Sequence, residues 1–193
     1  MSEAAEGTRI VQGQVGQIAG HSVGVEQVEA SGSSARIVVA GSTSGVAWEI
    51  AADLRPHELL PVCEGAFAVA AITPGPDGSG GAVEIRGRAD ASAPTGAICV
   101  PAGARLRIGG ASVMTATDFS ITAWRPDERT PASVQAEWYP ARLERQDTPA
   151  SDIHPVTVQS GGTASIGTWR VRAVAIHGAT ERRRAWLILE LEK

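Results

Sequence analysis

Glycines at a fixed distance from isoleucines constrain the fold of this chain more than any other sequence feature. The motif Gly-x-x-x-x-Ile, followed by Ala or Gly, begins at Gly13, Gly103 and Gly161. A glycine can adopt the positive φ of a tight turn without the penalty that a Cβ would bring. After Gly161 the sequence continues as a short stretch ending in Ile166, a second glycine turn, and an alternating segment from Trp169. The motif therefore predicts β-hairpins with tight glycine turns.

Two further pairs of apolar, β-branched segments predict hairpins. Residues 66–72 and 82–87 flank a tip rich in Pro and Gly, and residues 168–176 and 185–193 flank a charged tip. No long segment has apolar residues at a period of 3.6, so helix should be scarce. In the hairpin formed by residues 168–176 and 185–193, the alternation of apolar and polar residues must shift once for the apolar side chains to share one face. The side chains expected to face inward there are Trp169, Val171, Val174 and Ile176.

Two stretches are too rich in proline to be central strands. Residues 53–61 contain two prolines, and residues 140–155 contain three. Proline cannot donate to a β-ladder, so we expect short turns or crossing loops in both places. Together with the strand-like segments elsewhere, this predicts an all-β chain.

The two halves of the chain repeat one another. Aligning residue 13 with residue 103, and residue 65 with residue 167, matches glycines and apolar residues at both ends of each half. This favours a tandem pair of similar antiparallel units, each a small β-barrel or sandwich. One continuous β-barrel with a single core is the alternative.

The repeat also predicts the domain boundaries. We expect a tail at residues 1–7, a first β unit at residues 8–87, a linker at residues 88–96 and a second β unit at residues 97–193. Residues 88–97 have no periodicity, which is typical of a linker or an exposed crossing segment.

The half-unit pattern of strand, glycine turn, aromatic residue and alternating strand covers Gly13–Val28 and Gly161–Val174. It resembles a group of small uncharacterised actinobacterial β-domain proteins. The resemblance rests on glycine and apolar positions across most of each half, and it implies a fold but no chemistry.

Composition narrows the classes of partner. Hydrophobic residues make up 43% of the chain and charged residues 20%, which supports a packed core. The formal net charge of −4 disfavours a nucleic-acid partner, because such proteins need a basic face to neutralise phosphates. No apolar run is long enough to span a bilayer, so we expect no membrane partner.

The chain starts without a secretory signal, and we therefore expect a cytoplasmic protein. In that reducing compartment Cys63 and Cys99 should be buried thiols, since both lie in apolar segments and one pair is too few for a disulfide scaffold or a four-cysteine zinc site.

Two histidines are candidates for chemistry. His57 and His154 lie in the proline-rich stretches, and each follows an aspartate, Asp53 and Asp152 respectively. A carboxylate beside an imidazole can tune a general base or help to hold a metal. The spacings differ, however, and no nucleophile pattern accompanies them. The other two histidines, His21 and His177, are expected in exposed loops.

Two tryptophans, Trp48 and Trp138, each precede one of the proline-rich stretches. They belong either to the core or to an apolar ligand pocket, because pockets are mostly apolar with few polar groups. Trp169 is expected in the core. The candidate ligand-binding residues are thus Trp48, Trp138, His57 and His154, with no catalytic or metal-binding residue.

The chain has no Walker loop, dinucleotide fingerprint, HExxH motif or paired CxxC, and we expect no cofactor. The first hypothesis is a non-enzymatic β-domain that binds a protein partner or its own copy through loops and sheet edges. The alternative is a β-barrel that binds a small apolar ligand, extending to a cyclase or isomerase acting on an apolar natural-product-like substrate. A metal or acid–base enzyme using His57 and His154 ranks last.

Overall fold

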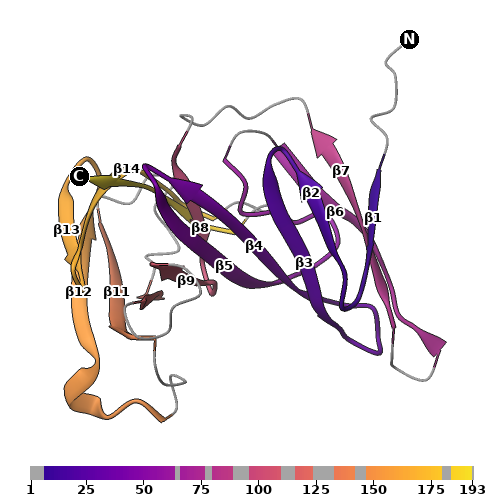
Figure 1. Cartoon of the computed structure of the whole chain (residues 1–193), viewed down its shortest axis with the longest axis horizontal. Coiled ribbons are helices and arrows are strands. Elements are labelled where there is room, and N and C mark those ends of the chain that lie inside the picture. Colours follow the sequence, from indigo (N-terminus) through magenta and orange to yellow (C-terminus); the bar gives the residue numbers. More distant parts are fainter. Residues whose placement is uncertain are drawn as a thin grey trace. The chain divides into compact units, whose positions relative to one another are not determined.

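The computed structural model describes residues 7–63, 66–76, 80–88, 96–109, 116–123, 133–141, 147–179 and 184–192. Within these ranges the protein is all-β, and they contain no α-helix. The strands form open antiparallel sheets, and none of the described sheets closes into a barrel. Figure 1 shows the strands, coloured from indigo at the N-terminus to yellow at the C-terminus. The predicted tail and most of the predicted linker lie outside the described residues.

The chain divides into two compact units. The first comprises Met1–Gly41 and Ala51–Thr95, and the second comprises Ser42–Ile50 and Gly96–Lys193. The tip of one hairpin from the first half of the sequence therefore belongs to the second unit, an exchange that the glycine repeat does not predict. Duplication of one unit into the other stays a prediction.

The first unit contains two sets of antiparallel strands. One has the order β1-β7-β6, and the other has the order β2-β3-β4-β5. The free side of β6 is covered by the segment after β5, where the N–H of His57 donates to the carbonyl of Val69 (2.6 Å) and the N–H of Leu60 donates to that of Phe67 (2.8 Å). The strands are β1 (Thr8–Val11), β2 (Val15–Ile18), β3 (His21–Val28), β4 (Ala35–Thr43), β5 (Val46–Leu54), β6 (Ala66–Thr73) and β7 (Ala82–Arg88).

The second unit contains two antiparallel sheets. The first has the order β12-β11-β10-β9, with the beginning of β5 beside β9, and the second has the order β13-β14-β15-β8. The 3₁₀ turn η3 (Ala150–Asp152) precedes β12. The strands are β8 (Ile98–Pro101), β9 (Arg105–Ile108), β10 (Thr117–Ala123), β11 (Ser133–Pro140), β12 (His154–Gln159), β13 (Thr163–Ile166), β14 (Trp169–His177) and β15 (Trp186–Glu192).

Alternate residues of the strands form the core, as a period of two requires. In the first unit β3 and β4 bury every second side chain over most of their length. In the second unit β9 does the same, whereas β10 and β15 each bury three consecutive residues, Thr117–Phe119 and Leu187–Leu189. The fully buried side chains of the second unit include Leu106, Ile108, Phe119, Leu187 and Leu189.

The three glycine motifs have the same local structure. Their glycines adopt φ values of +81°, +79° and +74°. In each case a four-residue strand follows, and the isoleucine that ends it is at most 4% exposed. The glycines are Gly13, Gly103 and Gly161, and the isoleucines are Ile18, Ile108 and Ile166. The motif therefore forms the predicted turn and short strand at all three places.

Two of these motifs also share their hydrogen bonds. The N–H of Gly13 donates to the carbonyl of Val25, and the N–H of Gly161 donates to that of Ala173, both at 2.8 Å. In both cases the second strand of the hairpin shifts its register against the next strand immediately after the accepting residue, β3 against β4 and β14 against β15, which marks a β-bulge. The β2–β3 and β13–β14 hairpins are therefore equivalent local structures.

Both predicted long hairpins are confirmed, β6 with β7 and β14 with β15. The slip predicted in the closing hairpin is the bulge after Ala173. Because of it, Val171, Ala173 and Ile176 are buried, whereas Val174 is only partly buried. The prediction that Val174 faces fully inward is therefore wrong.

His21 is not the exposed loop residue predicted from the sequence. It is the first residue of β3 and is only 8% exposed. The two-residue turn before it, Ala19 and Gly20, has positive φ at both positions, as a type I′ hairpin turn requires. A turn this tight ends before His21, and so His21 lies inside the sheet.

Candidate binding groove

Two tight hairpin turns and the end of β9 border an open groove in the second unit. Its volume is about 490 Å³, and its lining residues are Gly45, Val46, Ala47, Gly109, Thr168 and Trp169. These residues come from the tip of the β4–β5 hairpin, from the residue after β9, and from the β13–β14 turn. The groove therefore depends on how these three segments are held.

The β4–β5 hairpin is held by a buried indole. Its two-residue turn, Ser44 and Gly45, has positive φ at both positions. Below the turn, Trp48 is 2% exposed, and its Nε1–H donates to Oγ1 of Thr43 across the hairpin at 3.0 Å. The main-chain N–H of Gly109 also donates to the carbonyl of Ala47 at 3.0 Å. These bonds fix one wall of the groove.

The β13–β14 turn is held by close packing on β10. Gly167 has a φ of +60°, and a Cβ at this position would lie 2.5 Å from Oγ1 of Thr117 and 3.1 Å from its Cγ2. Only glycine fits so close to a buried threonine at this φ. Ile166 and Trp169 then pair across the turn, which places Thr168 and Trp169 in the groove.

Trp169 is not the fully buried core residue predicted from the sequence. It is partly exposed and lines the groove. Its indole nitrogen is buried and has no hydrogen-bond partner. A buried donor without an acceptor costs about 1–3 kcal/mol, so this indole retains a hydrogen-bond donor that the protein does not use.

All the described residues that line the groove are neutral. None of the six lining residues carries a carboxylate, an amine, a guanidinium or an imidazole. The polar groups available are the Thr168 hydroxyl and the main chain of the turns. The groove can thus contact a ligand through an aromatic ring and neutral hydrogen-bonding groups, and it offers no general acid or base.

The four residues that the sequence suggested for ligand binding do not line this groove. Trp48 lies beneath one wall, as described above. Trp138 and His154 are brought together on β11 and β12, where their rings stack with centroids 4.1 Å apart. His57 is an exposed turn residue of the first unit, with a φ of +72°. A ligand-binding role for these residues stays a prediction.

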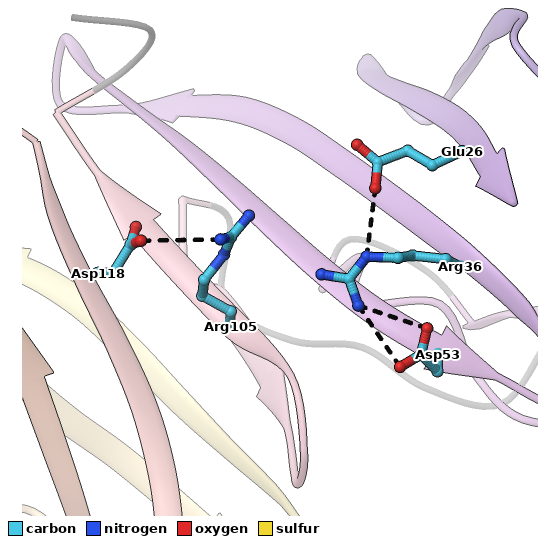
Figure 2. Close-up of polar contacts among 5 residues, drawn as sticks. All are labelled: Glu26, Arg36, Asp53, Arg105 and Asp118. Carbon is cyan, nitrogen blue, oxygen red and sulfur yellow. Dashed lines mark hydrogen bonds and ion pairs between the residues drawn. The ribbon is translucent and has the colours of Figure 1, made fainter. Parts of the chain in front are cut away.

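The aspartates expected to accompany the histidines have other partners. Asp53 pairs with Arg36, whose guanidinium also pairs with Glu26 at 3.2 Å, as Figure 2 shows. Asp152 accepts a hydrogen bond from the hydroxyl of Ser151. Among the residues with described positions, no three His, Cys, Asp or Glu side chains form a group that could hold a metal ion.

A buried carboxylate in the second unit was missed from the sequence. Asp118 on β10 is fully buried, and both its oxygens accept bonds from Arg107 on the neighbouring β9, at 2.8 and 3.1 Å. A second arginine, Arg105, lies 3.9 Å away (Figure 2). Buried charges need such partners because their desolvation is costly. The alternating Arg-x-Arg of β9 was the available signal.

Tyr139 lies beside this cluster on β11, opposite Asp118. Burial of the phenol, and secondarily the negative charge of Asp118, raise the pKa of Tyr139 above its usual value, while Arg105 opposes the shift. The cluster is an ion network satisfied by its own members, and it stabilises the sheet that carries Gly109.

Cys63 and Cys99 are not the free thiols predicted from the sequence. They are the only cysteines of the chain, and both are disulfide-bonded. Both are also buried, with exposures of 3% and 0%. The apolar context of the two residues predicted their burial correctly but carried no information about their pairing.

No protein-family model, curated protein or solved structure matches this chain. The resemblance to small actinobacterial β-domain proteins therefore stays a prediction. None of the helices in the described ranges is long and apolar enough to cross a membrane.

Proposed function

We propose that this protein is a non-enzymatic binding module and that its ligand lies in the groove beside Trp169. The observation that carries the proposal is the construction of the groove. Three separate segments converge on it, each held by specific contacts, and the groove has a partly exposed indole. Aromatic residues with few polar neighbours are typical of ligand sites, and the volume lies within the usual range of about 300–1,000 Å³.

Binding is favoured over catalysis by the lining itself. General acid–base chemistry needs a titratable side chain within hydrogen-bond reach of the reacting group. The six lining residues provide none, and the hydroxyl of Thr168 has no base among them to activate it. A role as a cyclase or isomerase for an apolar substrate would require an enclosed apolar cavity, whereas this groove is open and partly polar.

Assembly through sheet edges is the second candidate, because the sheets are open. The second unit ends its sheets in strands that discourage pairing, however. The edge strand β12 contains Pro155, which lacks an N–H, and the edge strands β13 and β8 have four residues each. Short edges and edge prolines are common protections against strand addition. A homo-oligomer or protein partner is therefore less well supported than a ligand in the groove.

The disulfide supports a compartment other than the reducing cytosol. Disulfides form and persist in oxidising environments and are rare in cytosolic proteins. We therefore propose that the module works in an oxidising compartment, in place of the cytoplasmic location expected from the sequence.

The test is a ligand screen read at the Trp169 indole. Uniformly ¹⁵N-labelled protein gives one indole N–H signal for each of its five tryptophans, and Trp169→Phe assigns the signal in question. Neutral fragments (polyols, small amides and phenols) are titrated at millimolar concentration. We expect at least one class to shift the Trp169 signal saturably, with the same affinity in the control Trp186→Phe, which lies outside the groove lining. If no fragment shifts this signal more than the other four, the proposal is wrong.

A further inference from the structure

We propose that the ligand of the groove is a neutral carbohydrate chain, bound with one sugar ring stacked on Trp169. This inference rests on the proposed binding function and specifies its ligand class. Three properties of the groove point to this ligand class: the neutral charge of its described lining, the pairing of its main chain, and the chemistry of its side chains.

The absence of charged groups in the lining excludes strongly charged ligands. A phosphate, carboxylate or ammonium group placed in the groove would lose part of its hydration and meet no opposite charge among the six lining residues. Nucleotides, acidic glycans and basic peptides would all carry this cost. A neutral ligand carries none of it.

The main chain of the groove disfavours an extended peptide. Peptides that bind β-proteins as an added strand need a row of unpaired N–H and C=O groups along a sheet edge. Here the N–H of Gly109 and the carbonyl of Ala47, both in the lining, are already bonded to each other. The remaining walls are two-residue turns, which present no such row.

The side chains of the groove match the apolar and the polar parts of a sugar ring. A pyranose ring has an apolar face of C–H groups and a rim of hydroxyl groups. The C–H face can pack on the partly exposed indole of Trp169. Thr168 supplies a hydroxyl that both donates and accepts. Gly45 leaves open space where a side chain would otherwise stand, so the chain of sugars can continue across the turn.

The experiment titrates ¹⁵N-labelled full-length protein with cellohexaose, maltohexaose, xylohexaose, mannohexaose and the hexamer of N-acetylglucosamine. Hexagalacturonate serves as the anionic counterpart, and neutral Gly/Ser/Thr hexapeptides as the peptide arm. We expect at least one neutral oligosaccharide to shift the Trp169 indole signal saturably and hexagalacturonate to have no effect. Read at the main-chain amide signals of Thr168 and Gly109, which also line the groove, Trp169→Ala should weaken the binding at least tenfold. Trp169→Phe, which keeps an aromatic face, should weaken it less, and Trp186→Phe, on β15 and outside the groove lining, should leave it unchanged.

The outcomes separate this inference from the function on which it rests. If neutral fragments shift the Trp169 signal but no oligosaccharide does, the carbohydrate inference is overturned and the binding function stands. If the hexapeptides alone bind, the inference is overturned in favour of a peptide ligand. If hexagalacturonate binds as tightly as the neutral sugars, the argument from charge is wrong. If no fragment, oligosaccharide or hexapeptide shifts the Trp169 signal, both the binding function and the carbohydrate inference are wrong.

Discussion

Gly167→Ala tests the contact that places Trp169 in the groove. The substitution has two costs that the structure separates. A residue with a Cβ in the left-handed region is strained by about 1–2 kcal/mol. The new Cβ would also lie 2.5 Å from Oγ1 and 3.1 Å from Cγ2 of Thr117, and forcing an extra methyl group into a packed site costs about 1–3 kcal/mol.

One effect opposes these costs. Replacing glycine by alanine reduces the freedom of the unfolded chain, which stabilises the native state by about 0.4–1 kcal/mol. The net loss in free energy of unfolding should therefore be about 3 kcal/mol. With a urea m-value of about 2 kcal/mol per molar, the midpoint of unfolding should fall by about 1.5 M.

Gly161→Ala is the matched control. Gly161 opens the same hairpin and has a φ of +74°, but a Cβ there would have nothing within 4 Å. Only the backbone strain remains, less the unfolded-state gain, so the loss should be about 1 kcal/mol. In the double variant Gly167→Ala/Thr117→Ala the two closest atoms are gone, and the pair should show a favourable coupling of about 1–3 kcal/mol.

Urea unfolding followed by tryptophan fluorescence measures five proteins: the wild type, Gly167→Ala, Gly161→Ala, the double variant, and Thr117→Ala, which the coupling energy requires. The reasoning fails if Gly167→Ala costs no more than Gly161→Ala, or if Thr117→Ala recovers none of the loss. The indole N–H signal of Trp169 should also move in Gly167→Ala and stay in place in Gly161→Ala, because only the former displaces the turn.

Three further predictions concern the framework around the groove. Asp118→Asn removes the carboxylate from a buried pair and should cost about 3 kcal/mol in urea unfolding; it should also lower the pKa of Tyr139, read from tyrosinate absorbance because this is the only tyrosine. Since burial raises that pKa in the native state, the contribution of Tyr139 to stability should be fully present below about pH 10 and be lost as the pH rises through the raised value, and a gain there would contradict the assignment. Trp48→Phe keeps the ring but loses the bond to Thr43 and should cost about 1 kcal/mol, with an unchanged unfolding midpoint as the contrary result. Reducing the disulfide-bonded Cys63 and Cys99 should lower the free energy of unfolding by about 2–4 kcal/mol, so equal unfolding midpoints with and without reductant would refute a stabilising role.

The turns and strands could be predicted from the sequence because their causes are local. Glycine at positive φ and alternation with a period of two are properties of a few neighbouring residues. They located the three motif strands and both long hairpins. The bulge after Ala173 was also predictable, as a slip that the apolar pattern required, although the pattern placed Val174 on the wrong face.

The binding groove could not be predicted, because its walls come from segments far apart in the chain. No sequence pattern around Gly45 or Gly109 indicates that these two residues line the same groove. Trp169 has the same local pattern as a core aromatic residue, and only the packing of Gly167 against Thr117 turns it toward the groove. The pairing of the two cysteines and the burial of Asp118 likewise depend on which residues a strand meets.

The β2–β3 and β13–β14 hairpins share one local structure but place their equivalent side chains in different environments. In each, a glycine motif ends in a buried isoleucine, a two-residue turn follows, and the next residue pairs with that isoleucine. That residue is His21 in the first unit and Trp169 in the second. His21 is 8% exposed, whereas Trp169 lines a groove because the tip of β4–β5 and the end of β9 border it. The hairpin sets the position of this side chain, and the neighbouring segments decide whether a ligand can reach it.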